Sequence, residues 1–174
     1  MQDQFLIREI QLDEIELILP LAMKSWKYTY KNIYSEDFIE NYVNRAYRKE
    51  SLQNIKEQSR KGLTLFVVLV NQLNGNLVGF AQVGYDRFWE SGEKALPLRL
   101  FRIYLDPAIL GRGLGSLLLE KVEEFVRKTG EKSYIVGVHE NNSIGLRFYE
   151  KMGFMAILKE SDAEGEIYYK KELN

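Results

Sequence analysis

Three glycines, Gly111, Gly113 and Gly115, occupy every second position between a strand-like apolar run and a stretch with helical periodicity. Glycine has no side chain, so the backbone can turn tightly there and approach a ligand closely. The first N–H groups of a helix have no internal partner, and together with the helix dipole they bind anions. This loop therefore predicts a phosphate or pyrophosphate site, to which Arg112 could add a charge-assisted contact.

Two common phosphate-binding patterns do not fit the loop. A P-loop needs GxxxxGK[ST], and no lysine-serine or lysine-threonine pair directly follows the glycines of this loop. A dinucleotide fingerprint needs GxGxxG, whereas this loop has the spacing GxGxG. An ordinary strand-to-helix turn is the alternative interpretation, and a nucleotide-binding regulator is another, although magnesium ligands at a recognisable spacing are missing.

Composition narrows the chemistry that can accompany such a loop. The 174 residues are enough for one domain, 1–174, and their 45% hydrophobic and 28% charged content is ordinary for a globular protein. The formal net charge of −1 gives no sign of a nucleic-acid or membrane partner. The absence of cysteine excludes a disulfide framework and a cysteine nucleophile, and with a single histidine it disfavours a metal centre.

The same composition suits a cytoplasmic protein. The first residues lack a basic patch followed by an apolar stretch, so we expect no signal peptide. A charge-free run spans Leu63 to Tyr85, but Asn71, Asn74 and Gly75 lie in its middle. A polar, turn-forming centre is unsuited to a membrane span, so the run predicts two strands joined by a turn.

The elements that position the loop follow from periodicity and from turn residues. Asp13 is expected to cap the first helix, and Ser35 to begin the second helical region, which continues to Ile55 in one or two pieces. The expected strands are 5–10, 63–70, 77–85, 98–105, 133–138, 155–159 and 166–171. Further helices are expected over 114–128 and 142–152, the latter capped by Asn142-Ser143. This order predicts one mixed α/β domain.

Two motifs resemble those of the GNAT acetyltransferase superfamily. The first comprises Ile103-Tyr104-Leu105, Pro107 and Leu110-Gly111-Arg112-Gly113-Leu114-Gly115. The second runs from Asn142 to Tyr149 and continues as Lys151-Met152-Gly153-Phe154. Their order and separation, with the opening Ile7-Arg8-Glu9-Ile10, extend the resemblance over nearly the whole chain.

The resemblance implies an α/β (α+β) fold with a bent, mixed, mostly antiparallel sheet of about seven strands flanked by about four helices. Its fourth and fifth strands would splay apart, and acetyl-CoA would lie in the cleft between them. The implied cofactor-binding residues are Ile103, Tyr104, Leu105, Leu110, Gly111, Arg112, Gly113, Leu114, Gly115, Ser116, Asn142 and Tyr149. The family places backbone at Ile103 and Leu105 along the pantetheine arm, and the amides of 111–116 on the pyrophosphate.

Acetyl transfer needs a neutral amine, a polarised thioester carbonyl and a stabilised thiolate. The Leu105 N–H is the expected partner of the carbonyl oxygen. Tyr149 is the expected catalytic residue at the sulfur. A tyrosine pKa of about 10 exceeds a thiol pKa of about 8.5, so full proton transfer is uphill by roughly 2 kcal/mol. Hydrogen bonding to the developing thiolate is therefore an equal alternative to acid catalysis, and a purely structural role in the core is a third.

The general base stays open in the sequence. Phe101 stands where polyamine acetyltransferases of this superfamily commonly place a glutamate. The candidates are His139, Glu140, Asp86 and Glu90, or a chain of water molecules. The absent glutamate also supports an alternative in which the chain is a non-catalytic acetyl-CoA sensor.

Three aromatic residues, Trp26, Tyr30 and Tyr34, recur at i, i+4 and i+8 and suggest the wall of an acceptor site, although helix packing also explains them. The segment from Trp26 through Leu52 loosely resembles bacterial spermidine/spermine acetyltransferases. We therefore expect an acetyl-CoA-dependent N-acetyltransferase acting on a small-molecule amine by direct attack in a ternary complex. The acceptor could be a polyamine, or alternatively a protein or peptide amine; family habit suggests a homodimer.

Overall fold

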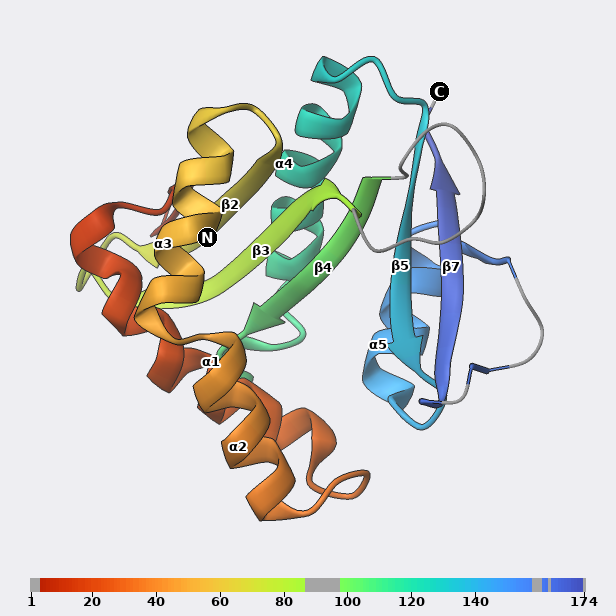
Figure 1. Ribbon diagram of the computed structural model, residues 1–174, viewed down its shortest axis with the longest axis horizontal. Coiled ribbons are helices and arrows are strands. Elements are labelled where there is room, and N and C mark those ends of the chain that lie inside the picture. The colour runs from red at the N-terminus through yellow and green to blue at the C-terminus, as the bar shows by residue number, and fades with distance from the viewer. Residues whose placement is uncertain (1–3, 87–97, 158–160, 163, 174) are drawn as a thin grey trace.

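A seven-stranded sheet forms the centre of the computed structural model, which describes residues 4–86, 98–157, 161–162 and 164–173 (Figure 1). The strand order is β1-β2-β3-β4-β5-β7-β6. The strands are β1 (Phe5–Glu9), β2 (Thr64–Asn71), β3 (Leu77–Tyr85), β4 (Leu98–Leu105), β5 (Ser133–His139), β6 (Met155–Ala156) and β7 (Glu166–Glu172). Every neighbouring pair is antiparallel except β4 with β5, which confirms the predicted mixed, mostly antiparallel sheet.

Five α-helices flank the sheet in the described part of the chain. They are α1 (Ile15–Tyr30), α2 (Glu36–Ala46), α3 (Lys49–Arg60), α4 (Leu114–Lys128) and α5 (Ser143–Lys151). The number exceeds the expected four because the second helical region divides into α2 and α3. Arg48, between them, has a φ of −63° and a ψ of 152°, and this extended ψ is incompatible with a helix interior.

The helix caps follow the sequence at two of three predicted positions. The Ser35 hydroxyl accepts a hydrogen bond from the Phe38 N–H, and the Asn142 side chain accepts one from the Gly145 N–H. Asp13 as a helix cap was wrong, because it lies within a 3₁₀ turn over Leu12–Glu14 that precedes α1. The Glu14 carboxylate takes the capping role in this turn, where it accepts the N–H of Gln11 at 3.0 Å.

Two hydrophobic cores lie on opposite faces of the sheet. Helices α1 to α3 cover one face, where Ile18 and Val43 pack with Phe80 of β3. Helix α4 covers the other face through Leu118 and Val122, and Tyr149 of α5 joins the same core. Helical spacing in the sequence predicted these apolar faces, and strand alternation supplies the matching surfaces of the sheet.

The fourth and fifth strands pair over only two positions, Arg99 with Ile135 and Leu100 with Val136. Beyond Leu100 the strands diverge, which confirms the predicted splay. A register shift lies at the same point, because Gln82 of β3 pairs with Arg102 whereas Val83 pairs with Leu100. Phe101 is thereby the extra residue of a β-bulge, and a bulge bends its strand and increases its twist.

Within the described residues, the helices are too short or too polar to cross a membrane.

Candidate active site

A cleft of about 430 Å³ opens where β4 and β5 separate. Its walls come from α1, β4, the glycine loop with the start of α4, β5 and α5. Of the predicted cofactor-binding residues, all but Arg112 line it: Ile103, Tyr104, Leu105, Leu110, Gly111, Gly113, Leu114, Gly115, Ser116, Asn142 and Tyr149. The structure therefore brings two motifs to the same cleft, although the first ends at Gly115 and the second begins only at Asn142.

The glycine loop forms one end of this cleft. Gly111 and Gly113 both have a φ of +77°, a conformation that L-residues with side chains rarely adopt. Gly113 precedes the first turn of α4, and no described side chain caps that turn. The N–H groups at the start of this 15-residue helix are thus left for a ligand, in the arrangement that suits a pyrophosphate.

The first turn of α4 also approaches α5 closely. A Cβ atom at Gly115 would lie 3.0 Å from the Phe148 ring, so a larger residue would push the two helices apart. Arg112 is exposed and does not line the cleft, so the predicted contact from its side chain finds no support in this geometry. Backbone N–H groups, rather than a cationic side chain, are what the loop offers to an anion.

Asn142 and Gly145 form the opposite wall. Asn142 is 8% exposed and caps α5 with its Oδ1, which accepts the Gly145 N–H at 3.0 Å. Its Nδ2 has no hydrogen-bond partner among the described residues and is available as a donor to a ligand. A Cβ at Gly145 would lie 2.8 Å from that Nδ2 and 3.0 Å from Val138, so glycine permits this close packing of α5 on β5.

Tyr149 lies in the cleft wall with its ring fixed by Phe148 and Phe154, whose ring centroids are 5.4 and 5.3 Å away. Its hydroxyl makes no hydrogen bond to any described residue. Burial, then the neighbouring Tyr30 and the charge of Glu166, raises the pKa of Tyr149 well above that of a free tyrosine. The side chain is therefore held in its protonated form, as a donor rather than as a source of a phenolate.

The end of β4 offers backbone groups to the cleft. The Asp106 N–H donates to the Val78 carbonyl of β3, so by strand alternation the backbone groups of Leu105 face the opposite edge. There the Leu105 carbonyl accepts a hydrogen bond from the Ser25 hydroxyl at 2.9 Å. The Leu105 N–H remains on the edge where β5 has turned away, which suits the predicted contact with a thioester carbonyl.

The aromatic residues of α1 divide between the cleft and the core. Tyr30 lines the cleft, and its hydroxyl lies 3.3 Å from that of Tyr104. Trp26 and Tyr34 are not cleft-lining residues, so packing explains them better than a wall does. The Trp26 Nε1 donates to the buried Tyr47 hydroxyl, and Tyr34 stacks on Phe38 with ring centroids 4.4 Å apart.

The predicted base candidates are poorly placed in the structure. His139 Nδ1 accepts the N–H of Asn141 at 3.1 Å, so the lone pair of this nitrogen is already engaged. Asp86 is buried and ion-paired with Arg99 at 3.2 Å. Glu140 is exposed and accepts from Ser161, while Glu90 lies outside the described residues.

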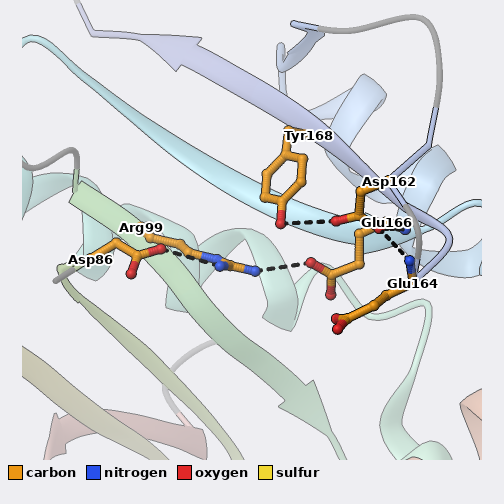
Figure 2. A network of polar contacts seen from close by, with 6 residues as sticks. All are labelled: Asp86, Arg99, Asp162, Glu164, Glu166 and Tyr168. Atoms are coloured by element: carbon orange, nitrogen blue, oxygen red, sulfur yellow. Dashed lines mark hydrogen bonds and ion pairs between the residues drawn. The ribbon is translucent and has the colours of Figure 1, made fainter. Parts of the chain in front are cut away.

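Sequence reasoning missed a network of polar contacts around Arg99, which Figure 2 shows. It lies beside the cleft, next to the cleft-lining Gly137. Arg99 of β4 extends between Asp86 and Glu166 of β7, with an Nη2 to Oε2 distance of 3.0 Å to Glu166. The guanidinium also lies over the rings of Phe101 and Tyr168, 5.9 and 5.4 Å from their centroids. No local signal could reveal this arrangement, because it depends on the register of β7 against β5.

Comparison with known proteins agrees with this geometry. The model of the Acetyltransferase (GNAT) family matches residues 27–154. A spermidine N(1)-acetyltransferase from Thermoplasma acidophilum is 32% identical over 95% of this chain and 96% of its own length. A spermine/spermidine N(1)-acetyltransferase from Bacillus subtilis is 31% identical over 57% of this chain and 65% of its own.

A solved structure has a similar fold over nearly the full length of both chains. The PaiA N-acetyltransferase of Thermoplasma acidophilum, in complex with coenzyme A, superposes with a TM-score of 0.84 at 29% identity and covers 97% of this chain and 98% of its own. The cleft, its glycine loop and the family match all point to the same co-substrate, acetyl-CoA. The chain belongs to the GNAT family and is an acetyl-CoA-dependent N-acetyltransferase.

Proposed function

We propose that the acceptor is a polyamine such as spermidine or spermine, acetylated at a primary amine by direct attack on the thioester in a ternary complex. The observation that carries this proposal is the similarity to a spermidine acetyltransferase over nearly the full length of both chains. The acceptor side of the cleft is compatible with a cation, because Tyr30 and Phe101 line it and Glu166 lies beside it. Aromatic faces and carboxylates are the usual partners of an ammonium group.

The cofactor half of the site supports the direct mechanism. The free N–H groups at the start of α4 would hold the pyrophosphate, and Asn142 Nδ2 would donate from the facing wall. The Leu105 N–H would polarise the thioester carbonyl at the open strand edge. Acetyl-CoA supplies the activated acyl group, and in a chain without cysteine the amine itself is the natural nucleophile.

Tyr149 would stabilise the departing sulfur. Its raised pKa makes complete transfer of the phenolic proton to a thiolate more costly than in free solution. We therefore assign it a hydrogen bond to the developing negative charge rather than the role of a strong acid. Of the alternatives left by the sequence, the proposal thus favours electrostatic stabilisation over acid catalysis.

The test is the release of CoA from acetyl-CoA across a panel of acceptors: spermine, spermidine, aminoglycosides, free amino acids, and peptides with lysine or a free N-terminus. Polyamines should give the highest kcat/KM. Initial-velocity lines that intersect when both substrates are varied would support the ternary complex, whereas parallel lines would indicate a covalent acetyl-enzyme. Preference for an amino acid or a peptide would overturn the polyamine assignment while leaving the enzyme class intact.

A further inference from the structure

The proposed reaction needs a group that takes the proton of the acceptor ammonium, and Phe101 leaves the usual position of that group without a carboxylate. Glu166 is a carboxylate placed close to this position by another strand. Its partner Arg99 lies over the Phe101 ring, two residues away on β4. Strand β7 thus brings a carboxylate close to the position at which β4 carries Phe101 instead of a glutamate.

Gly137 shows how near Glu166 comes to the cleft. This glycine lines the cleft directly beyond Val136, the last residue of β5 that pairs with β4. A Cβ at Gly137 would lie 2.6 Å from Glu166 Oε2 and 2.8 Å from Arg99 Nη2. The ion pair therefore crosses directly over the backbone of a cleft-lining residue, at the fork between the two strands.

The electrostatic reach of Glu166 supports the same placement. Burial is the main cause that raises the pKa of Tyr34 and Tyr149, and the negative charge of Glu166 contributes to both. The same charge helps raise the pKa of Tyr30, mainly through burial, to about 12. The charge of Glu166 thus acts on Tyr149 and Tyr30, both of which line the cleft.

Arg99 fixes the carboxylate without neutralising the site. The guanidinium is shared with Asp86, so one positive charge serves two carboxylates. Burial lowers the pKa of Arg99, but the charges of Glu166 and Asp86 outweigh it, and the guanidinium stays charged. The Glu166 side chain retains 33% exposure, in contrast to 4% for Asp86, so Glu166 is the member of the pair that a substrate can reach.

We infer that Glu166 binds the acceptor ammonium at the fork of β4 and β5 and accepts its proton, an assignment that rests on the proposed amine acetylation. The carboxylate takes one proton from the acceptor ammonium, and the nitrogen lone pair attacks the thioester carbonyl carbon. The C–S bond then breaks, and the second nitrogen proton neutralises the thiolate. Glu166 releases its proton to solvent before the next turnover.

The experiment compares Glu166→Gln with wild type in pH profiles of kcat and kcat/KM. Glutamine keeps the shape and can still accept a hydrogen bond from Arg99, so the fold should persist. We expect kcat to fall by about 10²-fold or more, as for loss of a general base, and the acidic limb of the kcat/KM profile to disappear. The KM for acetyl-CoA should stay within about twofold, since the glycine loop is untouched.

Glu164→Gln is the matched control, because it removes the same charge from an exposed residue two positions away in the same hairpin. It should change kcat by less than about twofold, as expected for a surface charge. In Glu166→Ala, added formate should restore activity, because the small carboxylate can enter the vacated space and act as the base. Failure of formate to raise the rate would contradict the proton-accepting role.

The inference is overturned if Glu166→Gln keeps the acidic limb and a kcat within about threefold of wild type. The identity of the acceptor does not affect this comparison, which uses whichever amine wild type acetylates fastest. If wild type acetylates no amine, the proposed function fails, and the comparison uses the slow release of CoA to water, in which Glu166 would take the proton of the attacking water. An unchanged hydrolysis rate in Glu166→Gln would then exclude Glu166 as the proton acceptor, independently of the failed proposed function.

Discussion

The Ser25 hydroxyl of α1 lies 2.9 Å from the carbonyl oxygen of Leu105, the last residue of β4. The same hydroxyl lies 2.9 Å from the Leu21 carbonyl one turn earlier, so its single hydrogen is shared between the two acceptors. Ser25 is 2% exposed and still contributes to the cleft wall. This contact ties the first helix to the strand edge whose N–H we assign to the thioester carbonyl.

Replacing Ser25 with alanine should therefore affect both stability and catalysis. Loss of one buried hydrogen bond is expected to lower the free energy of unfolding by about 1 kcal/mol. The end of β4 at Leu105 also loses the contact that holds it to α1. We therefore expect kcat to fall about tenfold while the Kd for CoA changes little. Urea unfolding and steady-state kinetics measure the two effects. A stability loss with unchanged kcat would show that Ser25 does not position the strand edge.

The αL conformation of Gly113 gives a test of the pyrophosphate cradle. Gly113→Ala places a side chain at a φ of +77°, which should cost about 1–2 kcal/mol of stability and displace the first N–H groups of α4. Gly130→Ala is the matched control, since Gly130 has a φ of +84° at the far end of α4 with open space around it. Calorimetry should show that Gly113→Ala weakens CoA binding by about tenfold or more. Equal CoA affinities in the two variants would place the pyrophosphate elsewhere.

Much of the cofactor half could be predicted from the sequence because it is local. Gly111, Gly113 and the cap at Asn142 derive their conformations from residues within a few positions, so spacing alone indicated them. The splay of β4 and β5 followed from the family resemblance, and the bulge at Phe101 gives its structural cause.

The acceptor half could not be predicted in the same way. Glu166 faces His139 across the β5–β7 pair and meets Arg99 from a third strand, a contact between residues 67 positions apart. Register between distant strands is determined by the packed sheet and not by local pattern. The helical spacing of Trp26 and Tyr34 is compatible both with an acceptor-site wall and with helix packing. The lining of the cleft, which includes neither residue, favours packing.

Tyr149→Phe removes the hydroxyl that we assign to the departing sulfur and leaves the ring contacts with Phe148 and Phe154. Loss of a hydrogen bond made mainly in the transition state should lower kcat by about 10²-fold, with little change in the Kd for CoA. Tyr149 acts in its protonated form, and its pKa is raised. The contribution of its hydroxyl to kcat should therefore persist as pH rises past 10. The ratio of wild-type to variant kcat should therefore stay constant from pH 7 to about 10. A ratio that declines towards pH 9 would show that the tyrosine ionises earlier.

The Arg8–Glu14 pair gives a pH-dependent contribution to stability away from the cleft. Glu14 receives two hydrogen bonds from the Arg8 guanidinium, and chiefly for this reason its pKa is lowered. A depressed carboxylate pKa stabilises the fold above the unfolded value of about 4.3, and this stability is lost as pH falls through the folded pKa. We expect Glu14→Gln to lower the free energy of unfolding by about 1 kcal/mol at pH 7 and by much less at pH 3. Urea unfolding at both values measures it, and a difference independent of pH would contradict the ion-pair explanation.

Two glycine substitutions should separate the acceptor half of the site from the cofactor half. The Cβ of Gly137→Ala would meet the flexible ends of Glu166 and Arg99, so the fold should tolerate it while the carboxylate is displaced. We expect kcat to fall about tenfold or more, with an unchanged Kd for CoA. Gly145→Ala instead would press on Asn142 and Val138 in the opposite wall, and should weaken CoA binding. Calorimetry with CoA and kinetics with the best amine, performed on both variants, should give opposite patterns. If Gly137→Ala weakened CoA binding as strongly as Gly145→Ala, the fork of β4 and β5 would belong to the cofactor site, and Glu166 would lose its role at the acceptor.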